Sequence, residues 1–204
     1  MGRFRIVVAA VMAALAVAGC NGKTASNAAS TDDMTLGDPN AKVTVVEYAS
    51  VGCPVCAKWD REIWPAFKAK YVDTKKIKFV YREMLVGAGP EVAVAASGFL
   101  LARCAGPDKY FTVLDTIYGA QQQAFQAPRD TLLDIARSAG MTEAQFNICI
   151  NDEKAILALN DRVDRHVKND HIDSTPTFVV NGKMLTPGFH ELADLDAAIA
   201  EAAK

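Results

Sequence analysis

The chain has 204 residues, a length that fits one domain or one domain with an insertion, because domains usually hold roughly 100–200 residues. Half of the residues are hydrophobic and 23% are charged, which suffices for a packed core and excludes an intrinsically disordered protein. The formal net charge is −2, and it becomes −4 once the positive charges of Arg3 and Arg5 are set aside. A mildly acidic body argues against nucleic acid as a partner, because phosphate binding needs a basic surface.

The N-terminus has the pattern of an export signal. Residues 1–5 carry two arginines, and Ile6–Ala18 is apolar over thirteen residues. A helix needs about 20 apolar residues to span a bilayer, so this shorter run matches the hydrophobic region of a secretory signal. Residues 17–20 (VAGC) resemble the site cut by bacterial lipoprotein signal peptidase, which predicts a signal peptide over residues 1–19 and a lipid on Cys20. Ordinary cleavage after Ala18, with Cys20 left as a free thiol, is the alternative.

A polar segment follows the predicted lipid site. Asn21–Asp33 holds no large apolar side chain, so we predict a flexible tether over residues 20–35. The lipoprotein resemblance implies several acyl chains on one cysteine, and firm anchoring requires two or more. Asn21 matches the sorting pattern of outer-membrane lipoproteins. The expected location is therefore the periplasm, with the protein tethered to a membrane and the outer membrane slightly favoured.

The next segment predicts a strand, a helix and a second strand. Val43–Ala49 is β-branched and apolar enough for a buried strand. Cys53–Tyr71 has helical spacing, and Pro65 is expected to kink this helix because proline removes a backbone hydrogen bond and crowds the preceding turn. Lys76–Leu85 is the second predicted strand, and Gly87–Pro90 interrupts the chain after it.

Helical patterns fill the middle of the chain. Five helices are expected, over residues 91–105, 108–118, 129–139, 142–150 and 152–168, the last three with N-caps at Asp130, Thr142 and Asn151. Residues 177–180 and 183–185 are expected to form a hairpin around Asn181–Gly182, and residues 189–203 a closing helix. We therefore predict an α/β domain over residues 36–89 and 170–204, interrupted by an all-helical insertion over residues 90–169.

Cys53 and Cys56 form a Cys-Pro-Val-Cys motif between the first predicted strand and helix. Pro54 fits the first helical position, where its missing N–H costs nothing. Cys53 then lies at the helix N-terminus, where unpaired N–H groups and the helix dipole stabilise a thiolate. This arrangement is typical of a redox dithiol, with Cys53 as the exposed attacking sulfur and Cys56 as the thiol that resolves the mixed disulfide.

An inert structural disulfide and half of a zinc site are the alternatives for this cysteine pair. Zinc would need a second pair of ligands, and His166, His171 and His190 are not accompanied by another Cys-x-x-Cys motif. We therefore expect no metal and no cofactor. A strand, this motif and a helix in an exported protein favour redox chemistry more strongly than a Cys-x-x-Cys motif alone.

Glu47 lies in the first predicted strand, six residues before Cys53. Strand alternation places it on the same face as Val43 and Val45, among apolar residues. Burial would raise its pKa, and a neutral acid near Cys56 could relay protons during thiol exchange. The alternative is an edge position at which Glu47 meets solvent, and alternation alone does not decide between the two.

Three features together resemble the DsbA-like branch of the thioredoxin superfamily, from about residue 36 to the C-terminus: residues 45–56 (VVEYASVGCPVC), the helical insertion, and residues 175–182 (TPTFVVNG). The resemblance implies a thioredoxin fold with an inserted helical domain, and thiol–disulfide exchange in the periplasm. The roles that it implies are an attacking cysteine, its buried partner, a buried acid, and a cis peptide beside the dithiol, at Cys53, Cys56, Glu47 and Thr175–Pro176. A cis proline there would let the Thr175 backbone pair with an extended substrate peptide.

The dipeptide between the cysteines, Pro54 and Val55, departs from the best-known strong oxidant of this family, which has His in place of Val55. An imidazole stabilises the reduced thiolate, and a stabilised reduced form makes a strong oxidant. Valine cannot do this. We therefore expect a higher Cys53 pKa and weaker oxidising power than in that relative.

Cys104 and Cys149 fall in separate predicted helices of the insertion. An oxidising compartment favours their pairing, and members of this family often carry such a second, structural disulfide. Two buried free thiols are the alternative. With a lipid on Cys20, the odd number of five cysteines is then accounted for.

The sequence thus predicts a lipid-anchored, monomeric thiol:disulfide oxidoreductase that introduces disulfides into reduced exported polypeptides and is reoxidised by a membrane redox partner. The same dithiol could serve a reductase or isomerase, but isomerases of related families are commonly oligomers built through an additional N-terminal domain. A copper-delivery protein of the thioredoxin fold is a further alternative. Its sites resemble Cys-x-x-x-Cys with a nearby His, whereas this chain has only two residues between Cys53 and Cys56.

Overall fold

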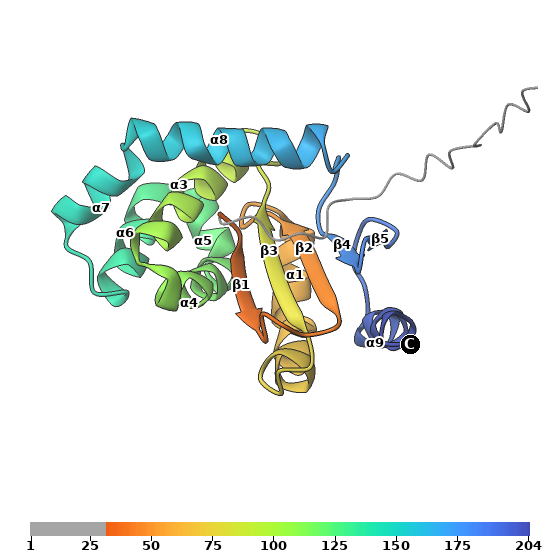
Figure 1. Cartoon of the computed structure of the whole chain (residues 1–204). Helices are drawn as coiled ribbons and strands as arrows, with labels where there is room; N and C mark the ends of the chain where they lie inside the picture. Colours follow the sequence, from red (N-terminus) through yellow and green to blue (C-terminus); the bar gives the residue numbers. More distant parts are fainter. Residues whose placement is uncertain (1–31) are drawn as a thin grey trace, which may run out of the picture.

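The computed structural model describes residues 32–204, which form a mixed α/β fold around one five-stranded sheet (Figure 1). The strand order is β1-β3-β2-β4-β5, and β2 is parallel to β3 while the other neighbours are antiparallel. The bounds are Met34–Gly37 (β1), Thr44–Ala49 (β2), Lys78–Glu83 (β3), Thr177–Val180 (β4) and Lys183–Met184 (β5).

Helices follow β2, fill the connection from β3 to β4, and end the chain. After β2 come α1 (Pro54–Glu62), α2 (Trp64–Phe67) and a π-helical turn, η1 (Lys68–Val72). The connection holds α3 (Pro90–Cys104), α4 (Pro107–Gly119), α5 (Gln121–Gln126), α6 (Pro128–Ser138), α7 (Glu143–Ile150) and α8 (Glu153–Lys168). The last helix is α9 (Leu192–Ala202). The predicted fold class, an α/β fold with a helical insertion, is confirmed. Figure 1 shows α3 to α7 gathered beside the sheet.

Strand β2 lies in the middle of the sheet and has two different faces. Val45 packs into the main core, which also holds α1 and much of the insertion. Val46 and Tyr48 belong to a second, smaller cluster on the opposite face. The Tyr48 ring meets the His166 ring of α8 at 5.5 Å between centroids. The alternation expected from the sequence therefore holds, and Glu47 is buried at 4% exposure in a strand with neighbours on both sides. The predicted alternative of a solvent-facing edge is wrong.

The segment after the cysteine motif is not one kinked helix, as the sequence predicted. The backbone breaks at Ile63, whose N–H still bonds to the Trp59 carbonyl at 2.8 Å and ends α1. Pro65 lies in the first turn of the next helix, α2, where a missing N–H is tolerated. The proline therefore starts a new helix and does not bend an existing one.

Helix starts in the insertion differ from the prediction at two of three N-caps. Thr142 caps α7 in a capping box with Gln145, as expected. Asp152, one residue after the predicted Asn151, caps α8 by accepting from two backbone N–H groups. Helix α6 is capped at Ala127, because Pro128 is favoured at the first helical position and places Asp130 inside the first turn.

The predicted tether ends before residue 35. Met34–Gly37 form the edge strand β1, and the Asp33 carboxylate pairs with Arg82 at 3.1 Å, both side chains being 4% exposed. A buried guanidinium needs a paired carboxylate, which explains why this part of the polar segment is held against the sheet. Residues 1–31 lie outside the described residues, and with them the predicted signal peptide, Cys20 and most of the tether.

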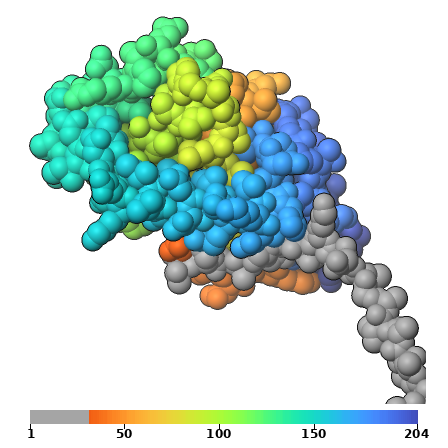
Figure 2. Space-filling model, turned by 90° about the horizontal axis from the view of Figure 1, so that it is seen from above, coloured from red at the N-terminus to blue at the C-terminus, as the bar shows by residue number. Residues whose placement is uncertain are grey.

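Ion pairs fasten the insertion to the sheet at the end of β3. Glu83 is 1% exposed and accepts hydrogen bonds from Arg103 of α3 (2.6 Å), Arg162 of α8 (2.7 Å) and Tyr110 of α4 (3.0 Å). Removing one partner of such a buried network is costly because it leaves an uncompensated charge. Figure 2 shows α8 lying along the surface of the molecule next to the yellow-green atoms of α3.

Candidate active site

The cysteine motif follows β2 through a tight turn. The Cys53 N–H bonds to the Ser50 carbonyl at 2.9 Å, and Cys53 becomes the N-cap of α1 with Pro54 at the start of the helix. A Cβ atom on Gly52 would lie 2.2 Å from the Glu91 carbonyl oxygen of α3. Only glycine fits at this close approach, so the insertion helps to set the path of the turn.

The Cys53 sulfur lies where a thiolate is stabilised. The backbone N–H of Cys56 points to it at 3.4 Å, and the Thr175 carbonyl oxygen is 3.5 Å away. Hydrogen-bond donors around the sulfur lower the Cys53 pKa from 9.0 to about 6, whereas the Thr175 carbonyl oxygen accepts a hydrogen bond from the thiol form. The main cause is hydrogen bonding from the Cys56 side chain. The Thr175 side chain and the Val55 and Cys56 N–H groups act in the same direction, while burial opposes them.

Cys56 differs from Cys53 in environment. It is 1% exposed, and burial raises its pKa well above the ordinary value. Cys53 is 7% exposed, less than the sequence predicted, because the loop that holds Thr175 lies against its sulfur. The pair therefore combines a sulfur that ionises near neutral pH with a sulfur that stays protonated.

The loop opposite the cysteines contains a cis peptide bond between Thr175 and Pro176, at the positions for which the family resemblance implied one. The Pro176 carbonyl accepts a hydrogen bond from Gly188 at 2.8 Å. The Thr175 hydroxyl is buried and makes no hydrogen bond of ordinary geometry among residues 32–204, although it is near enough to the Cys53 sulfur to lower the pKa of that thiol. A donor without a partner beside the Cys53 sulfur is suited to a thiolate or to a bound peptide.

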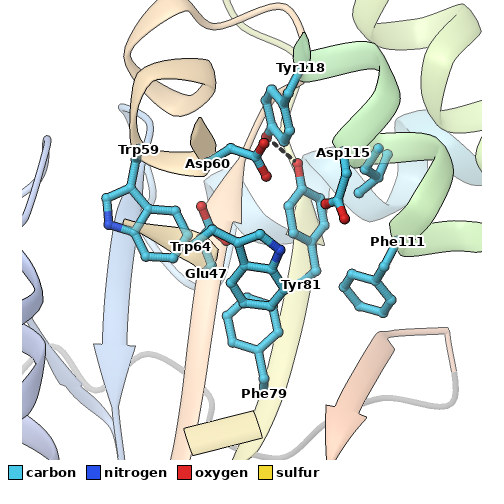
Figure 3. A pocket seen from close by; sticks show the side chains of 10 residues that line it. Glu47, Trp59, Asp60, Trp64, Phe79, Tyr81, Phe111, Asp115 and Tyr118 are labelled. Atoms are coloured by element: carbon cyan, nitrogen blue, oxygen red, sulfur yellow. Dashed lines mark hydrogen bonds between the residues drawn. The ribbon is translucent and has the colours of Figure 1, made fainter. Parts of the chain in front are cut away.

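Glu47 faces a small cavity on the α1 side of the sheet, lined by three carboxyl groups, two tyrosines, and five apolar or indole side chains (Figure 3). Its volume of about 10 Å³ suits one water molecule. Burial raises the Glu47 pKa well above its ordinary value, and nearby Asp60, Asp115 and Cys53 act in the same direction. Charge on Glu47 in turn raises the Cys56 pKa, so the two groups are electrostatically coupled.

Asp60 and Asp115 were not singled out from the sequence. Asp60 lies four residues after Cys56 on α1, a spacing that places the two on one helix face and could have drawn attention to it. Asp115 comes from α4 in the insertion, and no local pattern connects it to the cysteines. Burial raises the pKa of Asp60 to about 8 and that of Asp115 to about 6.

Gln121 is a second residue that the sequence analysis did not identify as part of the site. This side chain, from the start of α5, is 3% exposed and donates to the carbonyls of Val51 (2.8 Å) and Cys53 (3.0 Å). One amide group therefore holds the backbone on both sides of Gly52. The run of three glutamines did not identify Gln121 as a site residue, because only the tertiary fold brings it to the turn before Cys53.

Pro54 and Val55 form the exposed rim of the site. The Val55 side chain is 42% exposed, an uncommon position for a large apolar residue. Neither side chain offers a polar group to the cysteines, and weaker thiolate stabilisation than a histidine would give stays a prediction.

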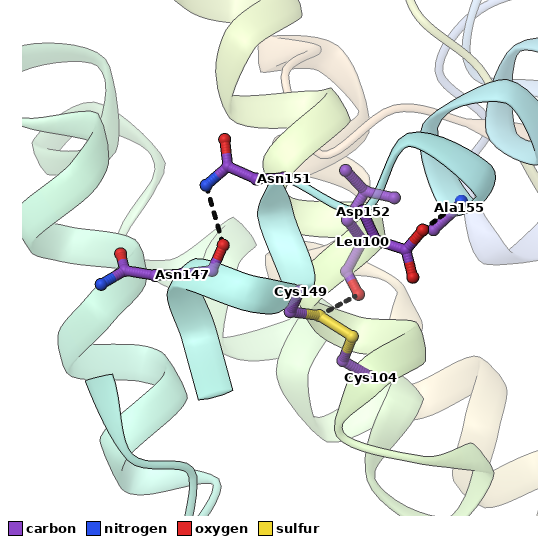
Figure 4. The surroundings of a disulfide bond; sticks show 7 residues. All are labelled: Leu100, Cys104, Asn147, Cys149, Asn151, Asp152 and Ala155. Atoms are coloured by element: carbon purple, nitrogen blue, oxygen red, sulfur yellow. Dashed lines mark hydrogen bonds between the residues drawn. A yellow bond between two sulfur atoms is a disulfide. The ribbon is translucent and has the colours of Figure 1, made fainter. Parts of the chain in front are cut away.

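Cys104 and Cys149 form a disulfide bond between the end of α3 and the end of α7 (Figure 4). Their Cα atoms are 6.3 Å apart, and 45 positions of sequence separate them. The bond joins elements inside the insertion, away from Cys53 and Cys56.

Residues 32–204 contain no group of three His, Cys, Asp or Glu side chains arranged to hold a metal ion. Over the same residues, no helix has the length and apolar character needed to cross a membrane. His166, one of the three histidines considered for zinc, instead contacts the Glu83 carbonyl oxygen at 3.0 Å.

A family model described as thioredoxin matches residues 29–201. The chain belongs to the thioredoxin family. Its fold is that of the DsbA-like branch, as two crystal structures illustrate. Wolbachia pipientis α-DsbA1 matches with a TM-score of 0.76 over 85% of this chain and 92% of that chain, at 23% identity. Chlamydia trachomatis DsbA matches with a TM-score of 0.70 over 89% and 97% of the two chains, at 18% identity.

Sequence relatives point in the same direction. A protein of Rickettsia conorii, named as a protein-disulfide oxidoreductase, is 36% identical over 154 residues, which make up 74% of this chain. Those residues cover 54% of the Rickettsia protein, so the chain spans little more than half of that relative.

Proposed function

We propose that this protein is a thiol:disulfide oxidoreductase that introduces disulfides into reduced exported polypeptides through Cys53 and Cys56. The observation that carries the proposal is the difference between the two sulfurs. The Cys53 pKa is lowered to about 6 at a helix N-terminus, whereas burial raises the Cys56 pKa. A stable Cys53 thiolate is a good leaving group, and a stabilised reduced form favours oxidation of the substrate.

The reaction begins with the oxidised pair. A substrate thiolate attacks the Cys53 sulfur, the Cys53–Cys56 bond breaks, and its electron pair leaves on Cys56, which takes up a proton. A second substrate thiolate then attacks the substrate sulfur of the mixed disulfide and releases the Cys53 thiolate. The substrate loses two electrons and gains a disulfide, and the enzyme gains those electrons. Glu47, which is coupled electrostatically to Cys56, is the acid proposed to supply its proton.

Substrate is proposed to bind as an extended peptide along the loop that holds Thr175 and Pro176. The Thr175 carbonyl oxygen is 3.5 Å from the attacked sulfur, so a strand paired with this backbone would bring its own cysteine to Cys53. The exposed Val55 side chain at the rim offers apolar contact to any sequence.

The remaining parts of the proposal concern location and partners. A lipid on Cys20 would tether a monomeric periplasmic domain to a membrane, the outer membrane slightly favoured, and a membrane redox partner would reoxidise Cys53 and Cys56. Labelling with a fatty-acid analogue in cells, in the native chain and in Cys20→Ser, tests the anchor. Loss of label in the variant is expected, and equal labelling would overturn the anchoring proposal.

The proposed activity is tested with oxidised protein and a reduced substrate that contains several cysteines. We expect stoichiometric formation of substrate disulfides, and no reaction in Cys53→Ser. The Cys56→Ser variant should accumulate a one-to-one mixed disulfide when offered a small-molecule disulfide, because it has no resolving thiol. Failure of the native protein to oxidise the substrate, together with rapid catalysis of insulin reduction, would overturn the oxidase direction in favour of a reductase or isomerase.

A further inference from the structure

The lysines of this protein are concentrated at one end of the sheet. Residues 32–204 contain twelve lysines, and the end at which β2 and β3 begin, with the segments that adjoin it, holds eight of them. Five lie in residues 68–78, and the other three are Lys42, Lys183 and Lys204. All eight are exposed or half-buried. We call this surface the lysine end.

Hydrogen bonds between distant segments bring these lysines together. The N–H of Lys78, at the start of β3, bonds to the Val43 carbonyl at 2.9 Å. Asn181, in the turn that leads into β5, donates to the Lys42 carbonyl at 3.2 Å. The Lys42 ammonium group donates to the Ala203 carbonyl just after α9. Figure 1 shows the gold segment that follows α1, together with α9, at the lower end of the molecule, and α8 at the upper end.

The lysine end has few acidic groups. The chain has a formal net charge of −2, and Arg3, Arg5 and Lys23 lie outside the described residues, so residues 32–204 carry −5. Beside its eight lysines, the lysine end has the C-terminal carboxylate and four acidic side chains, Asp38, Asp73, Asp196 and Glu201. The lysine end is therefore basic, and the rest of the described fold is acidic.

Three of the lysines have no acidic partner. The acids at this end are paired with other lysines, Asp73 with Lys68 at 2.5 Å, Asp196 with Lys70 at 2.7 Å, and Glu201 with Lys183 at 3.1 Å. Among residues 32–204, no salt bridge joins Lys75, Lys76 or Lys78 to a carboxylate. Lys75 also has a φ of 57°, a conformation that favours Gly or Asn, so local folding does not explain a lysine there.

The two cysteines lie at the opposite end of the sheet. Strand β2 runs from Thr44, beside the lysine end, to Ala49, and Cys53 follows it after one turn. Six residues of strand span about 20 Å. The Debye length at physiological ionic strength is about 8 Å, so a charged surface that touches the lysine end is largely screened at Cys53.

We propose that the lysine end is a docking surface for an anionic lipid bilayer, and that docking directs Cys53 and Cys56 away from the membrane. The inference rests on the tethering part of the proposed function and does not use the thiol chemistry. The segment before residue 32 is the part proposed to reach the membrane, so a bilayer is the anionic surface that stays close to this fold. The same surface repels the acidic remainder of the fold, which fixes the orientation.

The length of the proposed tether permits this orientation. Strand β1 begins at the cysteine end of the sheet, where Asp33 pairs with Arg82. The residues between Cys20 and Asp32 span up to roughly 40 Å when fully extended, about twice the length of the sheet. A tether of that reach lets the opposite end of the fold contact the bilayer. Each lysine near an anionic surface strengthens binding roughly fivefold, so a few unpaired lysines suffice to orient the domain.

The test uses the full chain bound to vesicles of phosphatidylcholine alone, or of equal parts phosphatidylcholine and phosphatidylglycerol. A water-soluble reagent acylates exposed lysines, and mass spectrometry gives the extent at each position. On anionic vesicles we expect several-fold less acylation at Lys75, Lys76 and Lys183 than on neutral vesicles, and unchanged acylation at Lys154. High salt should remove the difference. Cys53 should be alkylated at the same rate on both kinds of vesicle.

Charge variants test whether these lysines cause the binding. The first combines Lys75→Gln, Lys76→Gln and Lys78→Gln, and its preference for anionic over neutral vesicles should fall by about tenfold or more. The matched control removes the same charge elsewhere, by replacing three lysines outside the lysine end with glutamine, at Lys109, Lys154 and Lys168. It should keep the native preference. If the first variant does not fold, Lys75→Gln with Lys76→Gln, both at exposed positions, gives the same readout.

Three outcomes overturn the inference. These are equal acylation of the lysine end on both kinds of vesicle, an equal loss of preference in the control variant, and slower alkylation of Cys53 on anionic vesicles. The last result would mean that the cysteine end faces the lipid. Failure of the proposed function is distinguished, because the fatty-acid label at Cys20 and the oxidation of a reduced substrate are measured without these lysines.

Discussion

Raising the pH from 6 to 8 should make the folded, reduced native chain more stable relative to reduced Cys53→Ser, because only the native chain holds the Cys53 thiolate. The folded Cys53 pKa is about 6, whereas the ordinary value is 9.0. Over the interval between them, the folded state holds a thiolate and the unfolded chain holds a thiol. The folded pKa is the lower one, so the stabilisation is fully present above pH 9 and is lost as the pH falls through about 6.

The magnitude follows from the two pKa values. A shift of three units corresponds to about 4 kcal/mol once the thiol is ionised in both states. At pH 8 about 3 kcal/mol of this is present, and at pH 6 about 0.4 kcal/mol, so the expected gain is on the order of 2 kcal/mol. Cys53 is 7% exposed, which leaves little room for solvent screening to reduce the effect. Cys56 hardly contributes, because its raised pKa keeps it protonated throughout this range.

Urea unfolding of the reduced native chain and reduced Cys53→Ser at pH 6, 7 and 8 provides the measurement. The Cys104–Cys149 disulfide is kept intact, and alkylation confirms this. Glu47, Asp60 and Asp115 also titrate, and their raised pKa values lower the stability of both proteins as the pH rises. Most of this contribution cancels in the difference between the two proteins, and only the part of the Glu47 shift that Cys53 causes remains. The same pH dependence in both proteins would refute the assignment of a stabilised thiolate, as would alkylation of Cys53 with an inflection near pH 9.

Three substitutions test other parts of the site. Val55→His should lower the Cys53 pKa further and shift the equilibrium with glutathione toward the reduced enzyme, and an unchanged equilibrium would contradict the stated role of this position. Gln121→Leu removes the donor to two buried carbonyl groups, which costs about 1–3 kcal/mol each, so the urea midpoint should fall. An unchanged midpoint would show that the turn before Cys53 does not depend on Gln121. Replacing Cys104 and Cys149 with serine should lower the free energy of unfolding by about 4 kcal/mol and leave Cys53 alkylation unchanged; native stability would refute this.

The parts of the site that the sequence predicted are those encoded by neighbouring residues. Strand alternation put Glu47 on the same face as Val43 and Val45 but left its burial open, and the motif put Cys53 at the start of a helix, because both patterns are local. The cis peptide at Thr175–Pro176 came only from the family resemblance. Most X–Pro bonds are trans, and no local pattern distinguishes the exceptions.

The parts that the sequence did not predict depend on distant residues. Gln121 and Asp115 reach the site only because α4 and α5 pack against α1 and the turn before it. The ion pair that holds residue 33 against the sheet was not predicted for a similar reason. Asp33 lies in a polar segment with no local pattern, and only the fold brings Arg82 to it. The break at Ile63 was missed for a different reason, because helical periodicity continues across it and only Pro65 marks the place.

The helical insertion therefore contributes residues to the candidate active site and does not only cover it. Gln121 holds the backbone of the cysteine turn, and Asp115 lines the cavity that Glu47 faces. Arg103 and Arg162 neutralise Glu83 at the end of β3, where removal of the insertion would leave a buried charge. Without these helices Glu47 would meet water, its pKa would fall toward that of an ordinary carboxyl group, and Cys56 would lose the proton donor proposed for it. The chemistry proposed for the two cysteines thus depends on residues of the insertion such as Gln121, which lies 68 positions from Cys53 in the chain.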